Sequence, residues 1–223
     1  MKDYKKILNK KRNKLLYYIF DWDDNVLFMP TKIYVDKYIN NKWVNKSIST
    51  MKFRDVYKHI ENYNKKVYGI EDHNYIWRYR DNDVLKSLYE FRDFGKRGEK
   101  AFKLDVIKAM KKESFGPSFQ EFINTLIDGR IFLICTARGH EPKSIKSGVE
   151  YIIFKYLTNE QKNLMKHNLN EWGNTHIEDF KKLVNCYLNK CSFIATDSSY
   201  FKSTFNIDGY ISTADAKKIA IEN

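Results

Sequence analysis

Three carboxylates stand within four positions directly after a short apolar run near the start of the chain. The run at residues 17–20 is typical of a buried strand, and Asp21, Asp23 and Asp24 follow it. Carboxylates this close repel one another, so the cluster predicts a site for a cation and a phosphate rather than a solvated turn. Side chains alternate along a strand, which places Asp21 and Asp23 on one side. Two carboxylates so placed can share a Mg²⁺ ion and divide nucleophilic and acid–base work between them.

A second apolar run, at residues 131–135, ends in a hydroxyl, a cation and a glycine. The run is too short for a helix and too apolar for a surface strand, so it predicts a central parallel strand. Thr136 follows it directly, and Arg138 offers a planar fork that suits a phosphate or a substrate carboxylate. The alternative is a buried strand followed by a loop arginine that pairs with a surface acid.

A third apolar run, at residues 191–195, leads to Asp197. It predicts another strand of the same parallel sheet. In open sheets of this kind, ligands bind at the carboxyl ends of the strands. We therefore expect Asp21, Thr136 and Asp197 to lie near one another.

The three segments resemble motifs I, II and IV of the haloacid dehalogenase-like (HAD) phosphatases. Motif I of that family is an apolar strand followed by Asp-x-Asp-x-Thr or Val, and Asp21 and Asp23 stand at the two required positions. Asn25 occupies the position where Thr or Val is usual. Thr136 matches the phosphate-binding hydroxyl of motif II, and Asp197 matches one acid of motif IV.

Two parts of the family pattern are incomplete in this chain. Motif IV usually carries a second acid, whose place water, Ser198 or a downstream Asp208 could take. Motif III is a lysine that offsets negative charge, and Lys166, Lys181 and Lys182 all lie between the second and third runs. Lys181 is favoured because its helix leads directly into the third strand. The alternative is that each of these lysines is a solvated surface residue.

The resemblance implies a Mg²⁺-dependent phosphomonoester hydrolase that works through an aspartyl-phosphate. Asp21 is then the nucleophile, and Asp23 is the acid that protonates the leaving oxygen and the base that activates water. Thr136 and Lys181 hold the phosphoryl oxygens, whereas Arg138 and Asn25 contact the substrate. The expected metal ligands are Asp21, Asp23 through its backbone carbonyl, and Asp197.

The second interpretation is a HAD-fold protein that binds phosphate or nucleic acid with weak or no turnover. The departure at Asn25, the single acid of motif IV and the unassigned lysine favour it. Retention of both Asp21 and Asp23 favours the enzyme, since a pure binder has no need of a protonatable second acid.

The expected fold is α/β, a Rossmann-like parallel sheet wrapped by helices. Partial alternation over residues 32–50 around Asn40-Asn41 predicts a β-hairpin, which matches the flap that the family places after motif I. Mostly helical periodicity then extends to about residue 112. We therefore expect a core of residues 1–27 and 114–223, and an inserted flap and mainly helical cap at residues 28–113.

The net charge of +12 favours anionic partners. A basic arm precedes Leu15, and residues 75–103 interleave cations with aromatics such as Trp77. Such a stretch could stack bases and pair phosphates. The expected partners are a phosphorylated small molecule, a nucleotide or a nucleic-acid end, with non-specific nucleic acid on the basic surface. The alternative is that these aromatics pack inside the cap and that coding in an AT-rich genome, such as that of a large virus or phage, produced the lysines.

The remaining composition predicts an intracellular protein. Three cysteines without zinc-like spacing indicate reduced, buried thiols, and no apolar stretch is long enough to span a membrane. The first residues lack the long apolar region of a secretory signal. We expect a cytoplasmic location, in the host if the source is viral, with no membrane partner.

Overall fold

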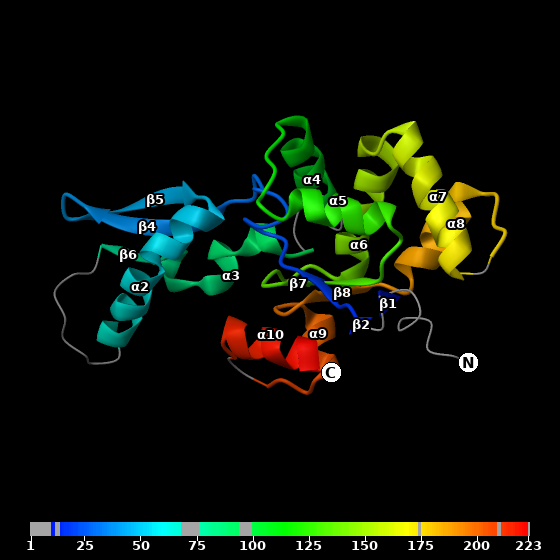
Figure 1. Ribbon diagram of the computed structural model, residues 1–223. Helices are drawn as coiled ribbons and strands as arrows, with labels where there is room; N and C mark the ends of the chain where they lie inside the picture. Colours follow the sequence, from blue (N-terminus) through cyan, green and yellow to red (C-terminus); the bar gives the residue numbers. More distant parts are fainter. Residues whose placement is uncertain are drawn as a thin grey trace. The chain divides into compact units, whose positions relative to one another are not determined.

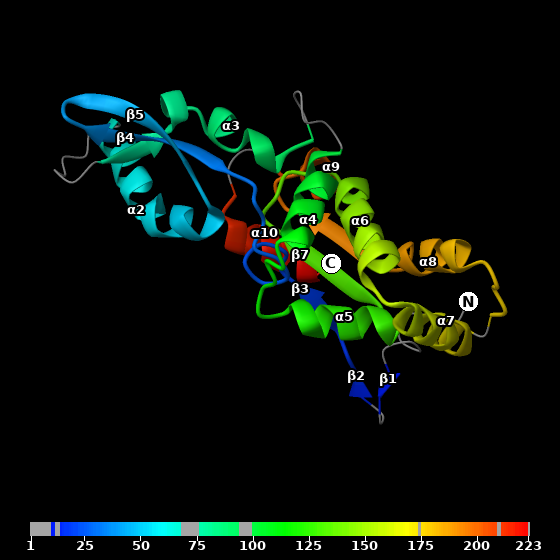
Figure 2. The same cartoon turned by 90° about the horizontal axis from the view of Figure 1, so that it is seen from above.

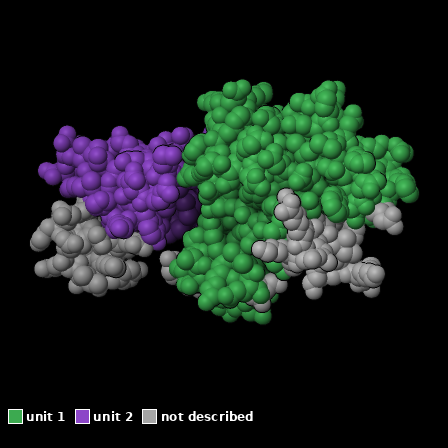
Figure 3. Space-filling view, in the orientation of Figure 1, with its two compact units in different colours: residues 1–29, 102–223 green, residues 30–101 purple. Residues whose placement is uncertain are grey.

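The computed structural model describes residues 10–11, 14–67, 76–93, 100–173, 175–208 and 211–222 (Figure 1). The chain divides into two compact units, shown in different colours in Figure 3. Unit 1 comprises Met1–Met29 and Phe102–Asn223, and unit 2 comprises Pro30–Ala101. No helix among the described residues has the length and apolar character that a membrane crossing requires.

Unit 1 contains a three-stranded parallel sheet, in the order β3-β7-β8. Strand β3 is Tyr18–Phe20, β7 is Phe132–Thr136 and β8 is Ser192–Ala195. In this register Phe20 pairs with Ile134, and Thr136 pairs with Ala195. The expected α/β class and parallel sheet are confirmed, and the three apolar runs of the sequence are its strands. A separate antiparallel pair, β1 (Lys10–Lys11) and β2 (Lys14–Leu15), precedes the sheet.

Helices cover both faces of this sheet (Figures 1 and 2). The main apolar cluster joins one face to residues of α4, α5, α6, α7 and α8, whereas Phe201, Ala216 and Ala220 of α9 and α10 pack near Cys135 on the other. The helices of unit 1 are α4 Ala101–Lys111, α5 Phe119–Ile127, α6 Pro142–Tyr151, the π-helical turn η3 Ile152–Tyr156, α7 Asn159–Gly173, α8 Phe180–Leu188, α9 Ser199–Thr204 and α10 Thr213–Glu222.

Local hydrogen bonds explain where several of these helices begin. The spacing Thr-x-x-Gln predicts a capping box at the start of α7, and Thr158 and Gln161 form it, each side chain accepting a backbone N–H of the other residue. The spacing of Thr175 and Glu178 predicts a second box for α8, but Asp179 caps that helix by accepting Lys182 N at 3.0 Å. Aspartate is among the strongest N-cap residues, and it starts the helix one turn later.

Helix α4 belongs to the core of unit 1. Its Phe102 and Val106 are fully buried in the main cluster, and an added Cβ at Gly148 of α6 would lie 2.6 Å from the Phe102 ring. The sequence division placed this helix in the insertion at residues 28–113, whereas unit 2 ends at Ala101. Helical periodicity marks the apolar face of a helix without indicating which core that face joins.

Unit 2 is a three-stranded antiparallel sheet with the order β5-β4-β6, packed against helix α2. The hairpin expected around Asn40-Asn41 is present, and both asparagines have positive φ, 48° and 60°. Strand β6 was not expected, and it adds a third strand to the expected hairpin. Its elements are β4 Ile33–Ile39, β5 Lys42–Ile48, α2 Thr50–Val67, β6 Trp77–Tyr79, η1 Arg80–Asn82, α3 Val84–Ser87 and η2 Tyr89–Phe91.

The cysteines follow the expected pattern in part. Cys135 and Cys191 are buried free thiols, but Cys186 is exposed, so the expectation of three buried thiols is wrong for that residue. Cys186 lies on α8 beside Tyr187 and Leu188, which are buried, and neighbouring helical positions point in different directions.

Candidate active site

The carboxyl ends of the three parallel strands of unit 1 meet at one edge of the sheet. Asp21 follows β3, Thr136 is the last residue of β7, and Thr196 and Asp197 follow β8. Two backbone hydrogen bonds hold the loops after β7 and β8 together: Thr196 N donates to Thr136 O at 2.9 Å, and Asp197 N donates to Arg138 O at 3.0 Å. This edge is the candidate active site.

Asp21 is the more accessible carboxylate of the pair that follows β3. Its side chain is 37% exposed, one oxygen accepts Trp22 N at 2.9 Å, and the other lies 2.7 Å from Lys217 Nζ. Trp22 is fully buried against Phe102 and Phe122, which anchors the backbone beside the carboxylate. The Asp21 side chain is therefore partly open to solvent while its charge is offset by a lysine.

Asp23 is held from the β7 side. Arg138 donates from Nε and a terminal nitrogen to the two carboxylate oxygens, at 2.8 and 2.6 Å, and the Thr136 hydroxyl lies 3.4 Å from one of them. The Arg138 side chain is completely buried, with its guanidinium 5.3 Å from the centre of the Phe102 ring. The sequence predicted that Arg138 contacts the substrate. In the structure, two of its nitrogens donate to Asp23.

The loop after Asp23 turns back through a left-handed residue. Asp24 has φ 61°, and Val26 N and Leu27 N both donate to Trp22 O. Asn25 is anchored by its main chain, since its carbonyl accepts Ser118 N at 2.9 Å. Gly116 packs so closely that an added Cβ would lie 2.2 Å from Asn25 O, so only glycine fits at this position. This packing fixes the loop that carries the acids.

Asp197 lies at the same edge but is paired elsewhere. Its carboxylate is 2.6 Å from Lys202 Nζ of α9. The neighbouring Ser198 hydroxyl caps α9 by accepting Phe201 N at 3.1 Å, and Asp208 is exposed. Over the described ranges, no three His, Cys, Asp or Glu side chains gather closely enough to form a ready metal cluster.

The donor chemistry of Asp21 and Asp23 nevertheless suits magnesium. Mg²⁺ prefers oxygen ligands, keeps several waters and commonly uses one or two protein carboxylates together with substrate phosphate. The Asp21 side chain is 37% exposed, and the Lys202 contact of Asp197 uses one of its two carboxylate oxygens. The residues at this edge therefore fit a hydrated magnesium ion better than a closed all-protein cage.

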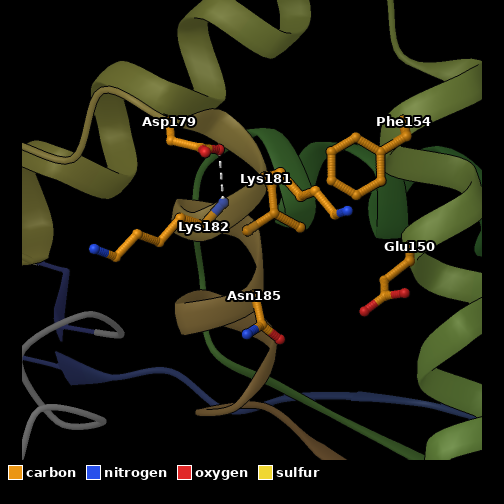
Figure 4. Close-up of a pocket in the computed structure, with 7 residues that line it drawn as sticks. Glu150, Phe154, Asp179, Lys181, Lys182 and Asn185 are labelled. Atoms are coloured by element: carbon orange, nitrogen blue, oxygen red, sulfur yellow. Dashed lines mark hydrogen bonds between the residues drawn. The ribbon is translucent and has the colours of Figure 1, made fainter.

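The lysines favoured by sequence lie away from these contacts. Lys181 and Lys182 line a surface pocket of about 320 Å³ with Glu150 and Phe154, and Figure 4 shows the Lys181 side chain extending toward Phe154. Lys166 pairs with Glu178 at 2.6 Å. No contact seen among the described residues joins these three lysines to Asp21.

Lys217 is the site residue that sequence reasoning missed. It stands 196 positions after Asp21 on α10, next to Ala216, which packs with Ala220 near Cys135 of β7. Burial raises the pKa of the Cys135 thiol, while Lys217 lowers it and Asp21 raises it, in keeping with the proximity of the three groups. Ala216 and Ala220 stand four residues apart, which indicates a helix face that packs closely against another element. This spacing does not indicate that the element is the sheet of unit 1, or that Lys217 lies at the edge with Asp21.

Comparisons with known proteins add no relative. No family model, no curated protein and no solved structure matches this chain. The function is therefore inferred from the residues and their geometry.

Proposed function

We propose that this protein is a Mg²⁺-dependent phosphomonoester hydrolase of the HAD type, with Asp21 as nucleophile. The proposal rests on one observation: Asp21 and Asp23 both lie at the end of β3. There Lys217 offsets the charge of Asp21, and Arg138 offsets the charge of Asp23. Cations so placed stabilise the charge that a phosphoryl group brings to the site.

The first step uses a carboxylate oxygen of Asp21. This oxygen attacks phosphorus, the bond from phosphorus to the ester oxygen breaks, and Asp23 in its acid form donates a proton to that ester oxygen, so that an aspartyl-phosphate forms and the alcohol is released. Trp22 N and Lys217 hold the carboxylate in place, at 2.9 and 2.7 Å. The Thr136 hydroxyl, on the adjacent strand end, is the donor for a phosphoryl oxygen.

The second step uses Asp23. It removes a proton from water, which attacks the aspartyl-phosphate and releases inorganic phosphate together with free Asp21. The bidentate contact with Arg138 fixes the direction of the Asp23 carboxylate. In this scheme Arg138 is a positioning residue, because its donors face Asp23.

Mg²⁺ would be held by Asp21, the backbone carbonyl of Asp23 and Asp197, and when bound it supplies positive charge to the phosphoryl oxygens. We expect Mg²⁺ to raise the melting temperature, because an ion that binds only the folded state stabilises it by mass action. Asp197→Asn should abolish that rise. Asp208→Asn should retain it, because Asp208 is an exposed acid in the segment after α9. A thermal melt with and without Mg²⁺ measures this, and an unchanged response in Asp197→Asn removes Asp197 from the site.

Hydrolysis of a chromogenic phosphate monoester, with Mg²⁺ and with a chelator, tests the proposal directly. We expect turnover that requires Mg²⁺. A panel of phosphorylated metabolites, nucleotides and end-phosphorylated oligonucleotides then identifies the substrate class. Absence of turnover on every member of the panel contradicts the proposal.

Replacing Lys217 distinguishes it from Lys181. Lys217→Met should lower kcat/KM by about 10²-fold or more, because the site loses a cation directed at the nucleophile and its phosphoryl group. Lys181→Met should stay within about two-fold of wild type, since it removes a lysine that lines the separate pocket of Figure 4. Equal losses in the two variants would contradict the assignment of the charge-offsetting role to Lys217.

A phosphate-binding protein without turnover is the second candidate. It is favoured by the two ion pairs at the site, in which Lys217 contacts Asp21 and Arg138 contacts Asp23. If this candidate is correct, the Asp21→Asn variant should still bind phosphate, and the wild-type protein should hydrolyse no ester. The same ester assay, combined with phosphate titration, separates the two candidates.

A further inference from the structure

Strand β5 forms one edge of the sheet in unit 2 (Figure 1). One face of this sheet contributes Ile33, Val35 and Trp77 to an apolar cluster with residues of α2. Trp77, which the sequence offered for base stacking, is 8% exposed and belongs to this core. β5 pairs with β4 on its inner side, and among the described residues no strand pairs with its outer side. A seven-residue edge of this kind can accept a further strand.

The outer side of β5 presents backbone groups suited to strand addition. Tyr38 N donates to Ile76 O on the β6 side, so Tyr38 and its partner Trp43 are a pair that exchanges no backbone hydrogen bond. Hydrogen-bonded and non-hydrogen-bonded pairs alternate along an antiparallel ladder. The N–H and C=O groups of Asn45 and Ser47 therefore point to the outer side as well. No backbone hydrogen bond of the described residues uses these groups.

The side chains of β5 that face the α2 side are Lys42, Val44, Lys46 and Ile48. The register sets this face, because Lys46 pairs with Val35 of the apolar cluster and side chains alternate along a strand. Lys42 and Lys46 are exposed, and Val44 between them is 36% exposed. Neither lysine forms an ion pair within the described part of the chain. The edge therefore carries two cations on either side of an apolar residue.

The charge on this face of the sheet is positive. Besides Lys42 and Lys46, the register places one other charged side chain on this face of the three strands, that of Lys37, the partner of Val44. Its Nζ lies 5.2 Å from the centre of the Trp77 ring. The three lysines lie around Val44, and none of the residues that β4, β5 and β6 place on this face is an acid.

This pattern disfavours pairing of β5 with a second copy of itself. Antiparallel pairing centred on Val44 would set Lys42 of each copy opposite Lys46 of the other. Like charges directly opposite one another destabilise a strand pair, and lysines protect edge strands in this way. A strand with carboxylates at the two facing positions would be stabilised instead.

We propose that the outer edge of β5 binds an extended acidic segment of a partner protein, which joins the sheet of unit 2 as an added strand. Asn45 and Ser47 hydrogen-bond its backbone. Two acids four positions apart face Lys42 and Lys46, and an apolar residue midway between them faces Val44. In antiparallel addition these are non-hydrogen-bonded pairs, whose side chains approach closely. The proposal is independent of the phosphatase proposal, because binding alone tests it.

Titration of the full-length protein with a labelled peptide tests the proposal by fluorescence anisotropy. The peptide is Thr-Glu-Thr-Val-Thr-Glu-Thr with blocked ends, which alternates threonine with the acid, apolar and acid positions. We expect saturable binding. Replacing both glutamates with glutamine should weaken it about 2- to 30-fold, because two cross-strand charge pairs are lost.

Exchanging the charges tests the chemistry of the partner. The double variant Lys42→Glu and Lys46→Glu should reverse the preference, so that a peptide with lysine in place of glutamate binds more tightly than the original peptide. The matched control is Lys111→Glu with Lys112→Glu, which changes two exposed lysines of unit 1 in the same way. This control should keep the preference of the wild-type protein.

Ser47→Pro tests strand addition itself. Proline lacks an N–H, and it is tolerated on an edge strand where that group points away from the sheet. We expect binding to weaken about 10-fold, because the added strand loses a hydrogen bond. Ser47→Ala, which keeps the N–H, should bind as wild type does. Circular dichroism of each variant checks that it is folded.

Three outcomes overturn the proposal. The first is no binding of the acidic peptide at low salt, since the lysines then serve only to keep the edge from associating. The second is equal affinity of wild type and folded Ser47→Pro, and the third is an unchanged preference in the variant with exchanged charges. Oligo-dT that competes as well as the peptide at equal charge also contradicts it, because charge alone then explains the binding.

Discussion

Replacing Asp21 with Asn should abolish the phosphomonoester hydrolysis that we propose, with an expected loss of about 10⁴-fold or more in kcat. Asparagine has the same shape as aspartate but cannot form an acyl phosphate, so the covalent route is closed. The fold should persist, because the amide oxygen of the new side chain can still accept Trp22 N, and the side chain it replaces is 37% exposed. Initial rates on the best substrate of the panel, together with a thermal melt, measure both effects.

The matched control for this variant is Asp24→Asn. It removes a carboxylate from the same loop, at a residue with φ 61°, a conformation that asparagine adopts readily. We expect its kcat to stay within about two-fold of wild type. If Asp21→Asn keeps substantial activity while the protein remains folded, the covalent mechanism is wrong.

Arg138→Met should be the most destabilising single change at the site. Its guanidinium is fully buried and bidentate on Asp23, whose side chain is 16% exposed. Removing one partner of a buried ion pair leaves an uncompensated charge, with an expected loss of about 3 kcal/mol in the free energy of unfolding. Chemical denaturation measures the loss, and the variant should also lose turnover because Asp23 is no longer held.

Arg130→Met provides the comparison, because Arg130 is also mostly buried in unit 1. Its partner Asp128 is 58% exposed and lies 4.0 Å away, so the pair is weak and screened by solvent. We expect a loss of about 1 kcal/mol or less from that pair. Equal losses for the two variants would show that the Arg138–Asp23 contact adds nothing beyond the burial of an arginine.

A double substitution sharpens this comparison. In Asp23→Asn the carboxylate is gone, so the further change Arg138→Met should cost less than it does in wild type. The difference between the two costs is the coupling energy of the pair. A coupling near zero would contradict the view that Arg138 acts through Asp23.

Short-range patterns determined the strands and several helix starts. The three apolar runs are β3, β7 and β8, and the Asn40-Asn41 turn and the Thr158 capping box form as expected. These features depend on residues within a few positions of one another, so their physics is contained in a short stretch of sequence. The third strand of unit 2 was missed because β6 pairs with β4 about 40 positions away.

The composition of the candidate site was visible in the sequence, but its pairing was not. Asp21, Asp23 and Thr136 stand at the ends of apolar runs, and a parallel sheet gathers such ends at one edge. The cations that contact these acids were not visible in the sequence. Arg138 was expected to contact substrate, and in the structure it contacts Asp23. Lys181 was favoured among Lys166, Lys181 and Lys182, whereas the lysine that contacts Asp21 is Lys217.

The sequence by itself determined where backbone turns and strands begin and which residue types meet at the strand ends. Only the tertiary structure decided which cation neutralises which acid, which helix joins which core, and which tryptophan is exposed. The physical reason is that lysines and aromatics are abundant in this chain, and each has the same local propensity wherever it stands. Their partners are chosen by the packing of helices such as α4 and α10 against distant strands, as when Ala216 and Ala220 bring Lys217 to Asp21.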